Sequence, residues 1–241
     1  MLNDFHPVHL SILPVASAMT LLTAGSLKGT MLDAPLKLMG PVTVMIITHA
    51  AVRTALDIKR KQTVGPLLIA PFLSLATCGA IWAFYGIGKG YPSVFAANLV
   101  CALGGLFSTA IYVKYSTMNR STAGLLIAAA GVILYSLYLT VEGSFETLGI
   151  IGDVFAVLLC AAPLGTVSTV ISERSTASMP FPMSCAAWVN TMVWLSYGYG
   201  VENDLYIYLP NILGLVLTSL QMALFALYGF PDNTKLPPAL N

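Results

Sequence analysis

The sequence predicts an all-α membrane protein with seven core transmembrane helices, arranged as two parallel three-helix bundles joined by a linker helix. Composition predicts that the chain lies in a membrane: hydrophobic residues make up 57% of the 241 positions, charged residues only 9%, and the mean hydropathy is +0.81. A soluble domain carries about 25% charged residues, because water must solvate its surface. The lipid bilayer is therefore the expected partner of this chain. A repeated pattern of aromatic and amide residues predicts the two bundles.

Composition also argues against several classes of function. The net charge is +1 and the densest basic tract is the three residues 59–61, so no nucleic acid partner is expected. The four cysteines lie singly in apolar runs without C-x-x-C spacing, so no metal site is expected. No paired aspartates, Gly-x-Ser-x-Gly motif or His-rich cluster is present. We therefore expect neither a catalytic site nor a cofactor, and the protein is predicted not to be an enzyme.

Apolar runs of about 20 residues, the length needed to cross a bilayer, give seven predicted spans. They lie at about 36–56, 66–88, 92–115, 122–141, 147–171, 180–200 and 205–229. A weaker apolar stretch at 8–27 contains Pro14 and several Ser and Thr residues, and we expect it to be a partly helical extra segment. Whether it spans the bilayer is left open. The predicted organisation is an N-terminal extension (1–35), a first three-helix repeat (36–115), a linker helix (116–146), a second three-helix repeat (147–229) and a cytosolic tail (230–241).

The charges in the short loops orient the seven spans, because basic residues collect on the cytosolic side. The loops after the first, third and fifth spans and the tail hold eight basic residues: Arg53, Lys59, Arg60, Lys61, Lys114, Arg120, Arg174 and Lys235. The opposite loops hold only Lys89 beside several acidic residues. The first core span is therefore predicted to begin outside, and the C-terminus to lie in the cytosol.

Two segments repeat the order Pro-Phe, Trp, Tyr-Gly, Asn. Residues 71–86 read PFLSLATCGAIWAFYG and precede Asn98, whereas residues 180–198 read PFPMSCAAWVNTMVWLSYG and precede Asn211. The distance from Trp to Asn is 16 residues in the first segment and 17 in the second. Both three-helix blocks begin on the same side, so the repeat is parallel and its axis is expected along the membrane normal.

These motifs resemble the SWEET sugar-transporter family. The resemblance is carried by CAAPLGTVSTVISERSTASMPF (160–181), by RKQTVGPLLIAPF (60–72) and by the repeated Trp, Tyr-Gly and Asn; it covers about 36–229 and is strongest over 160–229. It implies a facilitative carrier, a uniporter that works by alternating access and takes a mono- or disaccharide. The sequence leaves open which sugar is carried, whether the plasma membrane or an internal membrane hosts this multi-pass protein, and whether it forms a homo-oligomer.

The predicted substrate site consists of matching residues from both repeats. An amide in the membrane is costly unless it is hydrogen-bonded, and it offers donors and an acceptor to sugar hydroxyls. A tryptophan offers a flat apolar face to the C–H surface of a sugar ring. The resemblance implies that the two tryptophans and two asparagines form a central pocket, and the positions one helical turn before each tryptophan line the same face. The predicted substrate-binding residues are Trp82, Asn98, Trp194, Asn211, Cys78 and Asn190.

Prolines form a second predicted layer, because a proline removes a backbone hydrogen bond and lets a helix bend. The resemblance implies hinge prolines near the cytosolic gate in the first two helices of each repeat. Pro71, Pro163 and Pro180 match that pattern. The fourth place falls on Ala50 or Ala51, so either that helix needs no hinge, or Pro41 replaces it from a position nearer the outside, or the alignment slips there.

Other readings remain open. A PQ-loop-type amino-acid or other small-solute transporter shares the layout, but the chain has no Pro-Gln pair. A seven-span receptor fits the number of spans but not the duplication. The ionisable residues His49 and Asp153 fall at different depths of their predicted spans, so a proton-coupling pair is not expected.

Overall fold

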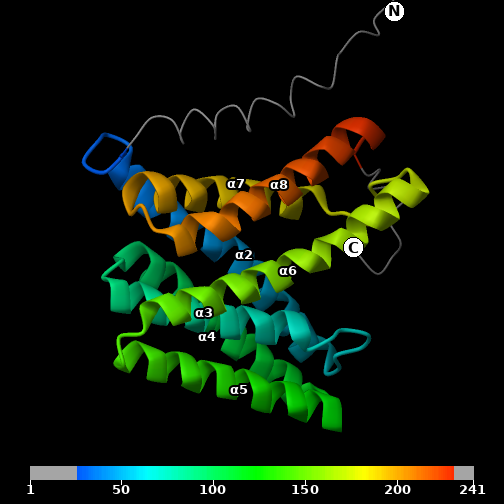
Figure 1. Ribbon diagram of the computed structural model, residues 1–241. Coiled ribbons are helices and arrows are strands. Elements are labelled where there is room, and N and C mark those ends of the chain that lie inside the picture. Colours follow the sequence, from blue (N-terminus) through cyan, green and yellow to red (C-terminus); the bar gives the residue numbers. More distant parts are fainter. Residues whose placement is uncertain (1–25, 231–241) are drawn as a thin grey trace, which may run out of the picture. The chain divides into compact units, whose positions relative to one another are not determined.

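The structure is a computed structural model that describes residues 26–230, apart from the side chains of 159–164 (Figure 1). Over these residues every regular element is helical, which confirms the predicted all-α class. The elements are α2 (Asp33–Lys61), α3 (Ala70–Lys89), α4 (Pro92–Tyr115), α5 (Arg120–Val141), α6 (Phe145–Glu173), α7 (Phe181–Ser196), the π-helical turn η1 (Tyr197–Val201) and α8 (Leu205–Tyr228). Nearly all of the predicted N-terminal segment 8–27, and the tail from 231 onward, lie outside the described residues.

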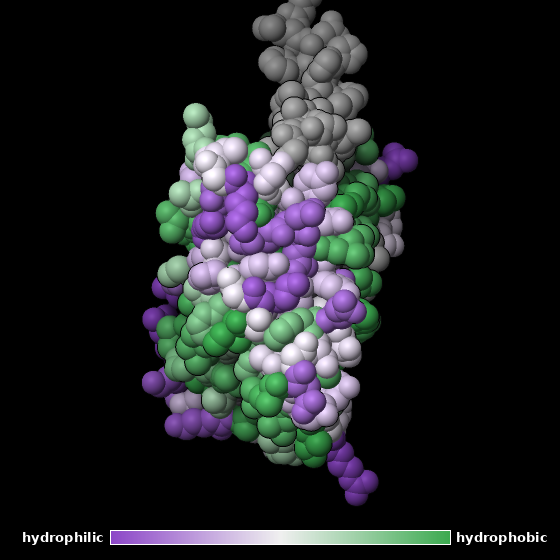
Figure 2. All heavy atoms as spheres, turned by 60° about the vertical axis from the view of Figure 1, so that its left-hand side comes forward, coloured by the Kyte–Doolittle hydropathy of each residue, from purple (hydrophilic) through white to green (hydrophobic). Residues whose placement is uncertain are grey.

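Five of these helices are long and apolar enough to cross a membrane: α2, α3, α4, α5 and α8. The other two predicted spans coincide with α6 and with α7 followed by η1. Helix α5 exposes Ile127 (74%), Leu134 (66%) and Val141 (78%). In Figure 2, hydrophobic residues gather toward the edges and the lower part of the face that it draws, beside hydrophilic residues in the middle. Soluble monomers rarely expose such extended apolar surface, so the chain is a multi-pass integral membrane protein.

Helix lengths repeat between the two halves of the chain. The first helices of the two repeats, α2 and α6, have 29 residues each, and the third helices, α4 and α8, have 24 each. The second helices differ slightly: α3 has 20 residues, whereas α7 has 16 and continues into the five residues of η1. The predicted duplication is therefore present in the helix lengths, with one additional residue in the second copy.

The chain divides into two compact units. Of the described residues, one unit contains 37–156, and the other contains 26–36 together with 157–230. Helix α5, the predicted linker, packs against α3 within the first of these units. The division falls between residues 156 and 157, inside α6, and the bounds of the repeats and of the linker stay a prediction.

Each unit has its own apolar cluster. In the unit of 37–156, helices α2, α3 and α4 and the residue before α3 contribute Ala55, Ile58, Ile69, Phe72, Ile111 and Tyr112. In the other unit, helices α6 and α8 and the loop before α7 contribute Val167, Val170, Met179, Leu224 and Phe225.

Loops that are predicted to share the cytosolic side contact one another. Gln62, after α2, donates from Nε2 to the Tyr115 hydroxyl at the end of α4, at 3.4 Å. Thr176, after α6, donates from Oγ1 to the carbonyl oxygen of Gly229 after α8, at 2.8 Å. The alternation of the predicted spans agrees with both contacts.

Segments that are predicted to share the outer side also meet. A Cβ atom on Gly88, near the end of α3, would strike the ring of Phe145 at the start of α6. Leu27, before α2, donates its backbone N–H to the carbonyl oxygen of Gly200 in η1, at 2.6 Å. These contacts agree with the predicted pairing of sides, while the absolute orientation stays a prediction.

Candidate functional site

The repeated tryptophans have the same aromatic neighbour in both repeats. The rings of Trp82 and Tyr85 in α3 meet edge to face, with centroids 5.4 Å apart and an interplanar angle of 75°. Trp194 and Tyr197 repeat this arrangement at 5.5 Å and 85°. Both tyrosines are almost fully buried. The three-residue spacing from Trp to Tyr places the two rings one helical turn apart on one face.

The repeated asparagines also match. Asn98 in α4 donates from Nδ2 to the Val94 carbonyl oxygen at 2.9 Å, and Asn211 in α8 donates to the Ile207 carbonyl oxygen at 2.7 Å. Both bonds run to the residue four positions earlier, so each amide is held against its own helix. One N–H group and the carbonyl oxygen of each amide remain available to bind a hydroxyl.

A close approach of the two helices supports this geometry in each repeat. A Cβ atom on Gly86 would lie 2.5 Å from the backbone nitrogen of Phe95, and one on Gly198 would lie 2.9 Å from that of Tyr208. Real Cβ atoms do not come so close to a backbone atom, so both positions require glycine. The Tyr-Gly motif is therefore explained in both copies: the tyrosine contacts the tryptophan, and the glycine admits the next helix.

The predicted residues one turn before each tryptophan are half-buried and adjoin a helix contact. Cys78 precedes Gly79, where a Cβ atom would lie 2.5 Å from the Ala102 nitrogen in α4. Asn190 precedes Thr191, whose Cγ2 would lie 2.7 Å from a Cβ atom on Gly214 in α8. The glycine at this contact is therefore Gly79 of the second helix in the first repeat, and Gly214 of the third helix in the second repeat.

The six predicted residues divide equally between the two compact units. Trp82, Asn98 and Cys78 belong to the unit of 37–156, and Trp194, Asn211 and Asn190 belong to the other.

Sequence reasoning missed two features beside the tryptophans. A Cβ atom on Gly152 of α6 would lie 2.9–3.3 Å from three atoms of the Trp82 ring, so this glycine leaves room for the indole. Glu202 accepts a hydrogen bond from the Tyr197 hydroxyl at 2.9 Å. The signal for Gly152 was a glycine inside a predicted span, which is too common to single it out. Among the residues that the structure describes, no group of three or more His, Cys, Asp or Glu side chains is placed to hold a metal ion.

The π-helical turn accounts for the unequal Trp-to-Asn spacing. In the second repeat the N–H of Glu202 bonds the carbonyl oxygen of Tyr197, five residues back, at 3.1 Å. In the first repeat α3 ends conventionally at Gly90, whose φ of 71° is the left-handed conformation that glycine adopts at helix ends. A π turn is the usual way for a helix to absorb one inserted residue, and such turns frequently lie at functional sites.

The three predicted hinge prolines occupy different positions. Pro71 is the second residue of α3 and Pro180 is the N-cap of α7, where a missing N–H costs no helical hydrogen bond. Pro163 lies inside α6, among the residues whose side chains are not described. Pro41 lies inside α2. Pro71 and Pro180 therefore mark the junctions before helices, and their role as hinges stays a prediction.

Comparisons with known proteins identify related sequences and a related fold. The family described as "Sugar efflux transporter for intercellular exchange" matches residues 35–120 and again 146–233. The two matched stretches overlap the two predicted repeats, and the gap between them, 121–145, contains all of α5 except its first residue.

Individual relatives carry the family name. "Sugar transporter SWEET1" of Caenorhabditis elegans is 26% identical over 196 residues, which is 81% of this chain and 65% of that protein. "Bidirectional sugar transporter SWEET11" of Arabidopsis thaliana is 30% identical over 206 residues, covering 80% of this chain and 70% of the relative. The solved structure of a eukaryotic SWEET transporter has the same fold, with a TM-score of 0.71 at 24% identity over 81% of this chain and 96% of that one. Two matched repeats, matched aromatic and amide geometry and a shared fold lead to one conclusion: the chain belongs to the SWEET family of sugar efflux transporters.

Proposed function

We propose that this protein is a facilitative sugar carrier, a uniporter that moves a mono- or disaccharide down its gradient. The observation that carries the proposal is the matched set of one tryptophan–tyrosine pair and one back-bonded asparagine in each repeat. A twofold set of this kind suits a ligand with hydroxyl groups around its edge and C–H groups on its faces. The relatives named as sugar transporters support the same substrate class.

In the proposed mechanism the repeats 36–115 and 147–229 rock against one another around a sugar held at the midplane, with 116–146 as the linker. Asn98 and Asn211 bind hydroxyl groups with the amide groups left by their back-bonds, and Trp82 and Trp194 cover the faces of the ring. Cys78 and Asn190 line the same site. Pro71, Pro163 and Pro180 let the cytosolic ends of their helices pivot.

The proposed orientation places the C-terminus in the cytosol and the residues before α2 outside. It rests on the distribution of basic residues in the loops. Loops assigned to one side contact one another within each unit, which supports the grouping of the loops into two sides.

Flux into liposomes that contain the purified protein tests the proposal. Labelled glucose and sucrose should equilibrate across the membrane, labelled amino acids should not enter, and Trp194→Ala should reduce the sugar flux. Trp188→Phe is the matched control, because Trp188 bonds Ser219 of α8 through Nε1 at 3.1 Å and is not a member of the proposed site. Uptake of amino acids without sugars would refute the proposal and favour a PQ-loop-type transporter.

A further inference from the structure

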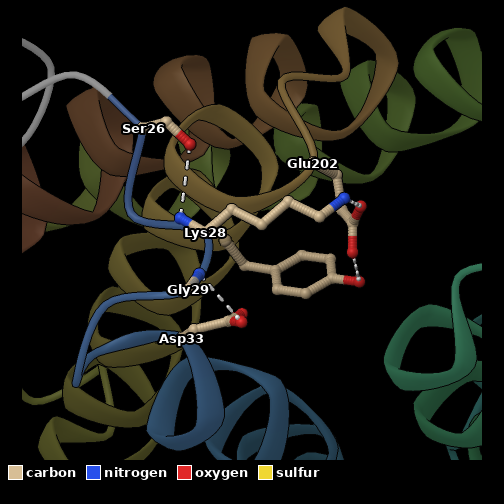
Figure 3. Close-up of polar contacts among 6 residues, drawn as sticks. Ser26, Lys28, Gly29, Asp33 and Glu202 are labelled. Carbon is tan, nitrogen blue, oxygen red and sulfur yellow. Dashed lines mark hydrogen bonds and ion pairs between the residues drawn. The ribbon is translucent and has the colours of Figure 1, made fainter.

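Residues 26–33, which we call the strap, form a compact turn against the second repeat before α2 begins (Figure 3). Leu27 is 7% exposed and donates its N–H to the Gly200 carbonyl oxygen at 2.6 Å. The Leu27 carbonyl oxygen accepts from Thr30 Oγ1 at 2.7 Å, and Asp33 Oδ2 accepts from the Gly29 N–H at 3.2 Å. The strap is therefore folded by its own hydrogen bonds and anchored at Leu27.

The strap contacts the second repeat at Gly200 of η1. A Cβ atom on Gly200 would lie 2.6 Å from Leu27 Cδ1 and 2.8 Å from Cγ, so the leucine side chain fills the space that this glycine leaves. The Gly200 carbonyl is at the end of the helical segment, where carbonyl groups lack a partner within the helix. The backbone N–H of Leu27 supplies that partner.

A chain of contacts joins the strap to the aromatic pair. Lys28 Nζ lies 3.7 Å from Glu202 Oε2, and the other carboxylate oxygen of Glu202 accepts from the Tyr197 hydroxyl at 2.9 Å. The Tyr197 ring is 1% exposed and meets Trp194 edge to face. The Glu202 side chain is 10% exposed, so its contacts are mostly shielded from water, whereas Lys28 is 64% exposed.

The first repeat is built differently at the same place. Lys89 of α3 lies over the rings of Tyr85 and Tyr91, at 5.9 Å and 5.8 Å from their centroids. The Lys89 ammonium group thus lies over the ring of Tyr85, whereas the Glu202 carboxylate accepts a hydrogen bond from the hydroxyl of Tyr197. The described contacts of the strap are with residues of the second repeat, Gly200 and Glu202.

We propose that the strap is a positioning device for the sugar site of the second repeat. When Leu27 is seated at Gly200, it fixes the end of η1 and therefore the carboxylate of Glu202. Glu202 holds the Tyr197 hydroxyl, and Tyr197 fixes the edge-to-face geometry of Trp194. Glu202 and Tyr197 are positioning residues that act through Trp194. This inference rests on the proposed function, since it assumes that Trp194 contacts sugar.

Two measurements on the full-length protein test it: hydrogen exchange of the amides of residues 27–30, and the KM and maximal rate of sugar flux in liposomes. Gly200→Ala should displace Leu27 and speed exchange by about tenfold or more. It should raise the sugar KM by roughly three- to tenfold, the effect of losing one hydrogen-bonded contact. The maximal rate should change little. Adding Leu27→Ala removes the atoms that clash with the new methyl group, so the double variant should exchange more slowly than Gly200→Ala alone.

The remaining variants distinguish the effect of the Leu27–Gly200 contact from the effect of the Lys28–Glu202 ion pair. Tyr197→Phe should raise KM without freeing the strap, because it removes the hydroxyl that bonds Glu202 and leaves Leu27 and Gly200 unchanged. Lys28→Ala should change KM by less than about twofold, because an exposed ion pair contributes little. Lys61→Ala, at the exposed far end of α2, is the control and should change nothing. If Gly200→Ala does not fold, Leu27→Ala alone removes the seated side chain without adding an atom, and increases in exchange and KM that are smaller but in the same direction are expected.

The outcomes that overturn the inference differ from those that overturn the proposed function. Fast exchange of residues 27–30 in the wild-type protein would show that the strap is not seated. A freed strap with an unchanged KM, or a raised KM with a strap still protected in Gly200→Ala, would show that the strap does not position the site. If Trp194→Ala leaves sugar flux unchanged, it is the proposed function that fails, and the exchange data still report whether the strap is seated.

Discussion

Replacing Asn98 or Asn211 by alanine should weaken sugar binding without unfolding the protein. The back-bond that each amide loses runs to a carbonyl oxygen within its own helix, at 2.9 Å and 2.7 Å. That carbonyl keeps the backbone N–H of the same residue as its helical partner, so the structural cost is small. The cost to the sugar is larger, because a hydroxyl left unpaired in a desolvated site loses about 1–3 kcal/mol. The corresponding loss of affinity is about fivefold to about 150-fold.

Asn119→Ala is the matched control for this prediction. Asn119 is the N-cap of α5, and its side chain accepts the N–H of Thr122 at 2.8 Å. The substitution should lower the free energy of unfolding by about 1 kcal/mol while leaving the sugar KM unchanged. The assay is sugar flux in liposomes over a range of concentrations, with thermal unfolding in detergent measured in parallel. If Asn98→Ala and Asn211→Ala keep the wild-type KM, or if Asn119→Ala raises it equally, the asparagines do not bind the sugar.

Three further outcomes are expected. Gly86→Ala should destabilise the protein by about 1–3 kcal/mol, because its methyl group would lie 2.5 Å from the Phe95 nitrogen, whereas Gly124→Ala, with no atom within 4 Å, should not lower the melting temperature. The sequon Asn119-Arg120-Ser121 should never be glycosylated in cells, because its loop is predicted to be cytosolic; a glycan there would invert the proposed orientation. Sugar uptake into liposomes should stop at equal concentrations on both sides, and accumulation that a protonophore abolishes would exclude a uniporter.

The sequence was sufficient to predict the helical class and the correspondence of Trp82 to Trp194 and of Asn98 to Asn211 as equivalent positions of two repeats. These predictions rest on local spacing, which helical geometry converts directly into positions along one face. The Tyr-Gly motif was visible as a pattern, but its two functions became clear only from the contacts of Tyr85 and Gly86.

Other features depend on partners that are distant in sequence. The sequence shows one additional residue between Trp194 and Asn211, but it does not show whether a loop or a π turn accommodates that residue. Leu27 fell in a stretch predicted only as an extension, because its burial depends on the space at Gly200, far along the chain. Proline is compatible with both a kink and a helix start, which is why the positions of Pro71 and Pro180 could not be predicted.

The length of the first helix in each repeat has a consequence for the surrounding lipid. With 29 residues each, α2 and α6 are about 44 Å long at 1.5 Å per residue, whereas the hydrocarbon core is about 30 Å thick. Each must tilt strongly or project past the acyl chains into the headgroup layer. The 24-residue helices α4 and α8, about 36 Å long, exceed that thickness by much less. The first helix of each repeat therefore reaches furthest into the headgroup layer, and the charged residues at the ends of α2, Asp33 and Lys59 to Lys61, lie outside the apolar stretch that crosses the acyl chains.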